Sequence, residues 1–81
     1  ERELMLLKVK ASGAARAEVK RLADIFRAQI VDVTSHLFTI QVSGTSDKLD
    51  AFLVSVTEGQ IVEVVRTGVT GLSRGDKTLS L

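Results

Sequence analysis

The residues best suited to chemistry lie together near the end of the chain. Residues 66–77 read RTGVTGLSRGDK and hold three of the six glycines and three basic residues. Glycine is costly to order and is kept where the backbone needs unusual dihedral angles or close approach, so this segment is typical of a shaped contact loop. Residues 71–78, GLSRGDKT, come close to the phosphate-binding loop of nucleotide hydrolases.

Two features argue against phosphate-loop chemistry. The motif needs glycine and lysine side by side, whereas Asp76 separates Gly75 from Lys77 and would repel a phosphate. The segment also follows the last predicted strand with too few residues left for the helix that completes such a site. We therefore expect no nucleotide hydrolysis here.

The other candidate residues form no catalytic or metal-binding constellation. His36 is the only histidine, and a metal site would need two or three further ligands. Ser73 lacks the strand-turn-helix elbow and the base that activate a nucleophile. Asp47 and Asp50 lie about one turn apart, where compensation of a helix dipole explains them. We expect no catalytic, metal-binding or cofactor-binding residue in this chain, which leaves a small binding or regulatory domain.

Composition predicts one ordinary globular domain, residues 1–81. The chain is 44% hydrophobic and 26% charged, and its net charge of +1 gives no electrostatic case for nucleic acid or an anionic membrane. It has no cysteine, no run of transmembrane length and no signal peptide, so we expect a soluble, cytoplasmic protein. Because it lacks an initiator methionine, we expect it to be part of a longer polypeptide.

Hydrophobic periodicity predicts six secondary-structure elements. Apolar residues recur at i, i+3, i+4 and i+7 in residues 14–28, which predicts a helix. Residues 44–47 predict the start of a second helix, because they supply a glycine break, a hydroxyl group that can cap the helix and an acidic residue for its first turn. This helix is expected to run to about Val56. Strands are expected over residues 4–9, 30–33, 37–42 and 61–65. This order predicts an α+β ferredoxin-like βαββαβ sandwich, with two helices on one face of a four-stranded antiparallel sheet.

The first and last strands, neighbours in this fold, are apolar on both faces. A half-exposed sheet should carry polar residues on its open face. If Met5, Leu7, Val9, Val62 and Val64 face the helices, the residues that face away are Leu4, Leu6, Ile61 and Val65. Such an exposed patch needs cover from a second copy, a preceding domain or a partner protein.

Four blocks of the sequence resemble one known family. Residues 18–26, 30–34, 44–53 and 66–75 read EVKRLADIF, IVDVT, GTSDKLDAFL and RTGVTGLSRG. In this order they are similar to the C-terminal domain of the small regulatory subunit of acetolactate synthase, also called acetohydroxyacid synthase. The resemblance covers essentially the whole chain. It implies a non-catalytic regulatory subunit that binds and activates the large catalytic subunit in valine, leucine and isoleucine biosynthesis.

The resemblance also implies where the chemistry and the regulation lie. In that family the large subunit holds thiamine diphosphate, magnesium and FAD, so no cofactor is expected in this chain. The small subunit also confers feedback inhibition by valine in many bacteria, through an N-terminal ACT domain. Nothing in this sequence matches the ACT domain, so no valine-binding residue is assigned. The C-terminal domains of the family form ferredoxin-like dimers, so we expect a homodimer that buries the face bearing Leu4, Leu6, Ile61 and Val65.

The glycine-rich basic tail, residues 65–81, is the candidate contact with the enzyme. A regulator must bind the active and inactive states of its enzyme differently, so it needs a shaped surface. The candidate partner-contact residues are Arg66, Gly68, Gly71, Leu72, Ser73, Arg74 and Gly75. The tail could instead cap a sheet edge or join the dimer. For the protein, the alternative is a free-standing dimer that senses a small molecule such as a branched-chain amino acid.

Overall fold

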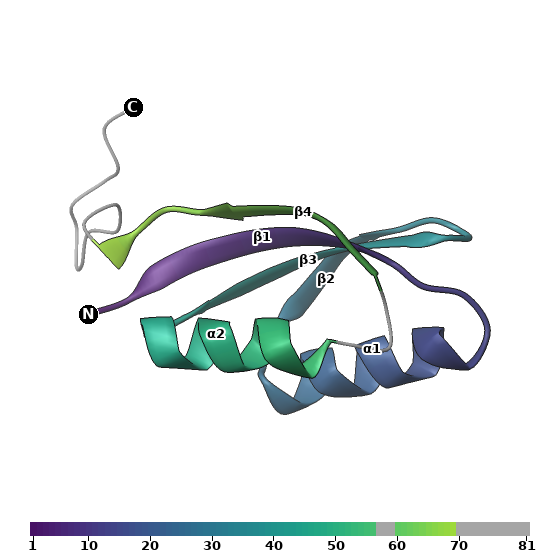
Figure 1. Cartoon of the computed structure of the whole chain (residues 1–81), viewed down its shortest axis with the longest axis horizontal. Coiled ribbons are helices and arrows are strands. Elements are labelled where there is room, and N and C mark those ends of the chain that lie inside the picture. The colour runs from purple at the N-terminus through teal and green to yellow at the C-terminus, as the bar shows by residue number, and fades with distance from the viewer. Residues whose placement is uncertain (57–59, 70–81) are drawn as a thin grey trace.

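The computed structural model describes residues 1–56 and 60–69, which form one antiparallel sheet and two helices (Figure 1). The elements follow the chain as β1 (Glu3–Lys10), α1 (Ala14–Ile25), β2 (Gln29–Val33), β3 (Leu37–Gly44), α2 (Ser46–Ser55) and β4 (Gln60–Arg66). The four strands lie in the order β2-β3-β1-β4, with both helices on one face. The predicted ferredoxin-like fold is therefore confirmed.

Helix α1 ends three residues earlier than its periodicity predicts. Arg27 takes a left-handed conformation with φ 57°. Its N–H donates to the carbonyl of Asp24 at 3.1 Å, and the N–H of Ala28 donates to the carbonyl of Ala23 at 2.7 Å. This pair of bonds is the Schellman motif, which satisfies the last carbonyls of a helix. Arginine is a good helix former that rarely adopts positive φ, so composition alone does not reveal this stop.

Helix α2 begins where the sequence predicts. The Thr45 hydroxyl accepts a hydrogen bond from the backbone N–H of Lys48 at 3.3 Å, and Asp47 lies in the first turn, where its charge favours the helix dipole. Leu49 and Phe52 are buried on the side of the sheet. In the described part of the chain, neither α1 nor α2 is long and apolar enough to cross a membrane.

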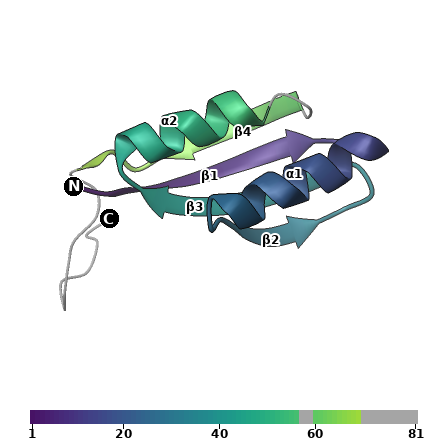
Figure 2. The same ribbon diagram turned by 90° about the horizontal axis from the view of Figure 1, so that it is seen from below.

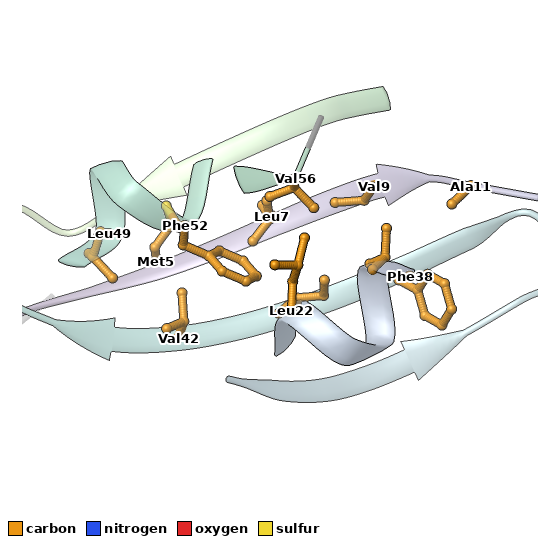
Figure 3. Close-up of a cluster of buried hydrophobic side chains, with 12 residues drawn as sticks. Met5, Leu7, Val9, Ala11, Leu22, Phe38, Val42, Leu49, Phe52 and Val56 are labelled. Atoms are coloured by element: carbon orange, nitrogen blue, oxygen red, sulfur yellow. The ribbon is translucent and has the colours of Figure 1, made fainter. Parts of the chain in front are cut away.

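The core lies between the helices and the sheet (Figure 3). Side chains alternate along a strand, so every second residue of β1 and β3 points toward the helices. Phe26, the residue that follows α1, packs against Phe52 of α2, with ring centroids 5.1 Å apart in an edge arrangement. The two helices lie next to each other across this face (Figure 2). The buried residues that meet here are Met5, Leu7, Val9, Val19, Leu22, Phe38, Ile40, Val42, Leu49, Phe52 and Val56.

Both edge strands carry a bulge. On β2, Ile30 pairs with Ile40 but Asp32 pairs with Thr39, so Val31 is an extra residue. A similar shift interrupts β4 opposite Lys8 and Val9 of β1. Bulges at sheet edges reorient side chains and hinder unwanted pairing with other strands. The bulge in β4 therefore decides which of its side chains reach the open face.

Candidate interaction surface

The sheet face opposite the helices carries an apolar patch on β1 and β4. Leu6 and Val65 are paired across these strands, and Leu4 lies two residues before Leu6 on the same face. Leu6 is 39% exposed, Val65 is 56% exposed and Leu4 is half-buried. We call these three residues the open-face patch. They occupy the face that the sequence predicts for them.

The open-face patch is bordered by polar side chains. Lys8 pairs with Thr39 on β3 and with Glu63 on β4, and its Nζ lies 3.6 Å from Glu63 Oε1. Together with Leu6 and Val65, these residues line a shallow hollow of about 160 Å³. The open face thus has an apolar end and a charged end. A partner that covers it needs apolar side chains opposite the first and hydrogen-bonding groups opposite the second.

The prediction that Ile61 shares this face is wrong. Glu63 pairs with Lys8, but Ile61 pairs with Val9, so Val62 is an extra residue between them. Paired residues share a face, and Val9 is buried on the helix side. Ile61 therefore lies on the helix side of the sheet. The prediction assumed unbroken alternation along β4, which a bulge interrupts.

A polar cluster lies at one end of the sheet around the carboxylate of Glu3. Its Oε1 accepts hydrogen bonds from Arg66 Nε at 3.3 Å and from the backbone N–H of Gly68 at 3.1 Å. Its Oε2 accepts from Ser46 Oγ and from Arg66 Nη2, both at 2.7 Å. Arg66 Nη1 also donates to Asp50 Oδ1 at 2.6 Å. We call these five residues the Glu3 clasp.

The Glu3 clasp holds its carboxylate in the charged form. Glu3 is only 4% exposed, and a buried carboxylate is costly unless donors surround it. Hydrogen bonds from Arg66 and then Ser46 lower the pKa of Glu3 from 4.5 to about 2. The hydrogen bonds that Arg66 donates to Glu3 and Asp50 raise the pKa of its own guanidinium group. Within residues 1–56 and 60–69, no buried side-chain N or O atom lacks a partner, and no three acidic or histidine side chains group to hold a metal.

Two of the predicted partner-contact residues belong to this clasp. Arg66 donates hydrogen bonds from Nε and Nη2 to Glu3 and from Nη1 to Asp50, so its charge is paired within the domain. Its contact with an enzyme stays a prediction. Gly68 has φ 78°, a left-handed conformation that favours glycine. The other predicted contacts lie outside the described residues: Gly71, Leu72, Ser73, Arg74 and Gly75.

Sequence reasoning missed Glu3 and explained Asp50 only by the helix dipole. A signal for Glu3 was present, because the alternation that buries Met5 places Glu3 on the same face. A charge on a buried face requires a partner. The sequence did not reveal which partner, since Arg66 is 63 residues away.

We expect Glu3 to make the fold sensitive to acid. The pKa of Glu3 is about 2 in the folded protein against an ordinary 4.5, so the unfolded chain binds its proton first. The stability that the charge contributes is complete above pH 4.5 and is lost as pH falls toward 2. Urea unfolding at a series of pH values should therefore show a steeper loss over this range for the wild type than for Glu3→Gln.

Glu18, a half-buried residue on the surface of α1, is the matched control for this experiment. Its pKa is also lowered, chiefly by its hydrogen bond with Arg21 on the surface of α1. Exposed pairs contribute little, so Glu18→Gln should retain most of the wild-type pH dependence. Equal slopes for the wild type and Glu3→Gln below pH 4.5 would contradict the expected role of Glu3.

Comparison with known proteins places the chain in one protein family. The family described as the small subunit of acetolactate synthase matches residues 2–75. The acetolactate synthase isozyme 3 small subunit of Salmonella typhimurium is 62% identical over 80 residues, and that of Escherichia coli is 61% identical. Each alignment covers 98% of this chain and 49% of the relative. The chain thus spans about half the length of these curated relatives and corresponds to their C-terminal part.

A solved structure supports the same relationship. The crystal structure of the acetolactate synthase small subunit from Thermotoga maritima superposes with a TM-score of 0.77 at 34% identity. The match covers 83% of this chain and 41% of that one. The family match over residues 2–75 shows that this chain belongs to the family of the small subunit of acetolactate synthase, and the solved structure has the same fold over 83% of the chain.

Proposed function

We propose that this chain is the C-terminal domain of a regulatory subunit that binds and activates the large catalytic subunit of acetolactate synthase. The observation that carries the proposal is the 62% identity to a named small subunit over 98% of the chain. In this role the chain contributes no catalytic residue. It acts in the synthesis of valine, leucine and isoleucine.

The cofactors and the sensing of valine belong elsewhere in this proposal. Thiamine diphosphate, magnesium and FAD are held by the large subunit, where the carbon-carbon bond is made. Valine is bound by an ACT domain that precedes this chain in the complete regulatory subunit. The complex works in the cytoplasm, where its substrates are.

We propose that the large subunit is contacted by the glycine-rich tail. Arg74 and Leu72 are the charged and apolar anchors of this contact, and Gly71, Ser73 and Gly75 shape its path. A charge-assisted hydrogen bond from Arg74 to a carboxylate of the enzyme is stronger than a neutral one and needs defined geometry. The Glu3 clasp supports the proposal, because it fixes the last described residues before this segment.

We further propose that a second copy covers the open face of the sheet. Leu6 and Val65 lie side by side and exposed, and isolated protein surfaces seldom keep such groups together in water. A two-fold axis through this face would bring each open-face patch against its equivalent, as isologous interfaces require. Lys8 and Glu63, at the border, would then meet the polar end of the partner.

Activation of the large subunit tests the proposed function. Adding the complete regulatory protein to its large subunit should raise the rate of acetolactate formation and yield a complex on size exclusion. Arg74→Glu should raise the concentration for half-maximal activation by about tenfold, the equivalent of one lost charge contact.

Lys20→Glu is the matched control for Arg74→Glu. Lys20 is an exposed cation of α1, on the helix layer, so the same charge reversal there should leave activation unchanged. Absence of both activation and a complex with the wild-type protein would refute the proposed function. Normal activation by Arg74→Glu would refute only the contact assigned to Arg74.

A further inference from the structure

A groove of about 450 Å³ lies between α1 and β2. Helix α1 runs alongside β2 on the helix side of the sheet (Figure 2). Arg16 and Ala17 of α1 line one side of the groove, Ile30 and Val33 of β2 line the other, and Phe38 of β3 also contributes. In the described sheet β2 is an edge strand, so the groove is open along that edge. We call it the α1–β2 groove.

The bulge in β2 gives the α1–β2 groove its apolar wall. Side chains alternate along a regular strand, so residues three apart point to opposite faces. Ile30 nevertheless pairs with the buried Ile40, and Val33 pairs with the buried Phe38. Both side chains therefore lie on the helix side, because the extra residue Val31 shifts the alternation. Val33 is 50% exposed, so its methyl groups are available to a partner.

Arg16 is held in place on the other side of the groove. Its Nη1 donates hydrogen bonds to the carbonyls of Thr34 at 3.1 Å and Ser35 at 3.0 Å, and a longer one to that of Ala11 at 3.4 Å. Its guanidinium group also lies over the ring of Phe38, 4.6 Å from the centroid. These contacts order the side chain before any ligand arrives, which lowers the entropic cost of binding.

The remaining donors of Arg16 are unused within the described part of the chain. Nε and Nη2 form no hydrogen bond with residues 1–56 and 60–69, and no carboxylate of these residues pairs with the guanidinium group. In Arg66, the same two nitrogens bind both carboxylate oxygens of Glu3. Arg16 thus presents the pair of donors that binds a carboxylate in a bidentate manner.

The groove therefore matches a ligand with a carboxylate on one side and apolar groups on the other. An extended peptide has this arrangement when acidic and apolar residues alternate, because successive side chains point in opposite directions. Its apolar side chains recur about every 7 Å, which suits two contacts along one face of β2. A small acid would leave most of the open groove to water, whereas small-molecule sites enclose most of their ligand. A peptide segment is thus favoured.

We propose that the α1–β2 groove docks an extended segment of a partner protein in which acidic and apolar residues alternate. A carboxylate of this segment pairs with Nε and Nη2 of Arg16, and its apolar side chains pack against Ile30 and Val33. Arg16 contacts the turn between β2 and β3, at the opposite end of the sheet from the end of β4 (Figure 1). The inference goes beyond the proposed function, because the groove takes a second partner.

Titration of the 81-residue chain with acetyl-Asp-Leu-Asp-Leu-amide, followed by NMR, tests the proposal. The methyl signals of Ile30 and Val33 and the Nε signal of Arg16 should shift and saturate, with a dissociation constant on the order of 1 mM. The control peptide is acetyl-Asn-Leu-Asn-Leu-amide. It should bind at least about tenfold more weakly, because its amides cannot form charge-assisted hydrogen bonds with Arg16.

Arg16→Lys tests the carboxylate contact. It keeps the positive charge and removes the two-donor edge, so it should weaken binding of the acidic peptide by about tenfold. Arg21→Lys is the matched control, because Arg21 lies on the same helix, does not line the groove and pairs with Glu18. Its dissociation constant for the peptide should stay within about twofold of the wild-type value.

Val33→Ala tests the apolar wall, and it is the second variant if Arg16→Lys does not fold. It should weaken binding of the acidic peptide by about fivefold, because two methyl groups no longer contact the leucines. Val31→Ala is the matched control on the same strand. Val31 is 48% exposed and does not line the groove, so its truncation should change the dissociation constant by no more than about twofold.

Several results would overturn the proposal. No shift at about 10 mM acidic peptide would show that the groove does not dock such a segment. Equal affinities for the acidic and the amide peptide would exclude the carboxylate contact, and unchanged affinities in both Arg16→Lys and Val33→Ala would place the peptide elsewhere. If 4-methylpentanoate binds as tightly as the peptide, the groove is a site for small acids instead. The assay contains no large subunit, so none of these results decides the proposed function.

Discussion

Phe52→Ala is expected to destabilise the fold by about 3–5 kcal/mol, the range for truncating a buried aromatic side chain. Phe52 is fully buried on α2, where it faces the sheet (Figure 3). Its ring packs in an edge arrangement with Phe26, the residue that follows α1. Removing the ring leaves a cavity where the two helices and the sheet meet. Because domains of this size have a total stability of about 5–15 kcal/mol, the variant should lose much of it.

Urea unfolding followed by far-ultraviolet circular dichroism measures this effect, since the chain has no tryptophan or tyrosine for fluorescence. Protein concentration is kept constant, because association would add to the apparent stability. Val54→Ala on the same helix is the matched control. Val54 is 73% exposed, so its truncation should cost no more than about 0.5 kcal/mol. Similar losses for the two variants would mean that Phe52 is not at the centre of the core.

Leu6→Asp is expected to weaken self-association of the domain by at least about 100-fold. Leu6 lies in the open-face patch beside Val65, which we propose is buried by a second copy. The two-fold symmetry of such a dimer brings the substitution into the interface twice. Each new carboxylate would lose water without gaining a partner among apolar side chains, which is strongly unfavourable. Sedimentation velocity across a concentration series measures the dissociation constant.

Val54→Asp is the matched control for the dimer experiment. It places the same charge on a more exposed valine of α2, on the helix layer and away from the open face. Its dissociation constant should stay within about twofold of the wild-type value. An unchanged constant for Leu6→Asp would show that the open-face patch is not the dimer interface. A wild-type protein that sediments as a monomer at tens of micromolar would count against the dimer itself.

The secondary structure could be predicted because its signals are local. The spacing of Val19, Leu22 and Ala23 indicates which side of α1 is buried, whatever lies opposite. The hydroxyl of Thr45 and the charge of Asp47 mark the start of α2 within a few residues. From the order of the elements, general rules of strand connection then leave the ferredoxin-like fold as the prediction that the structure confirms.

Two predictions, the end of α1 and the face of Ile61, were wrong because contacts in the folded chain overrode the local sequence pattern. Arg27 has a good helix propensity, yet it ends α1 in a left-handed conformation as the chain turns toward β2. Ile61 alternates correctly within its own strand, yet the bulge at Val62 turns it to the helix side. Neither feature has a signature in the residues around it. The first depends on how the chain leaves α1 toward β2, and the second on how β4 pairs with β1.

The candidate site also has one part that the sequence predicts and one part that only the tertiary structure shows. The sequence by itself determined the family, the two helices, the four strands and the apolar character of Leu4, Leu6 and Val65, because these are properties of residue type and short spacing. Only the tertiary structure decided that Glu3 binds Arg66 and Gly68, across 63 and 65 residues of sequence. Such a contact depends on strand register and on the meeting of three chain segments, and no periodicity of 2 or 3.6 residues encodes it.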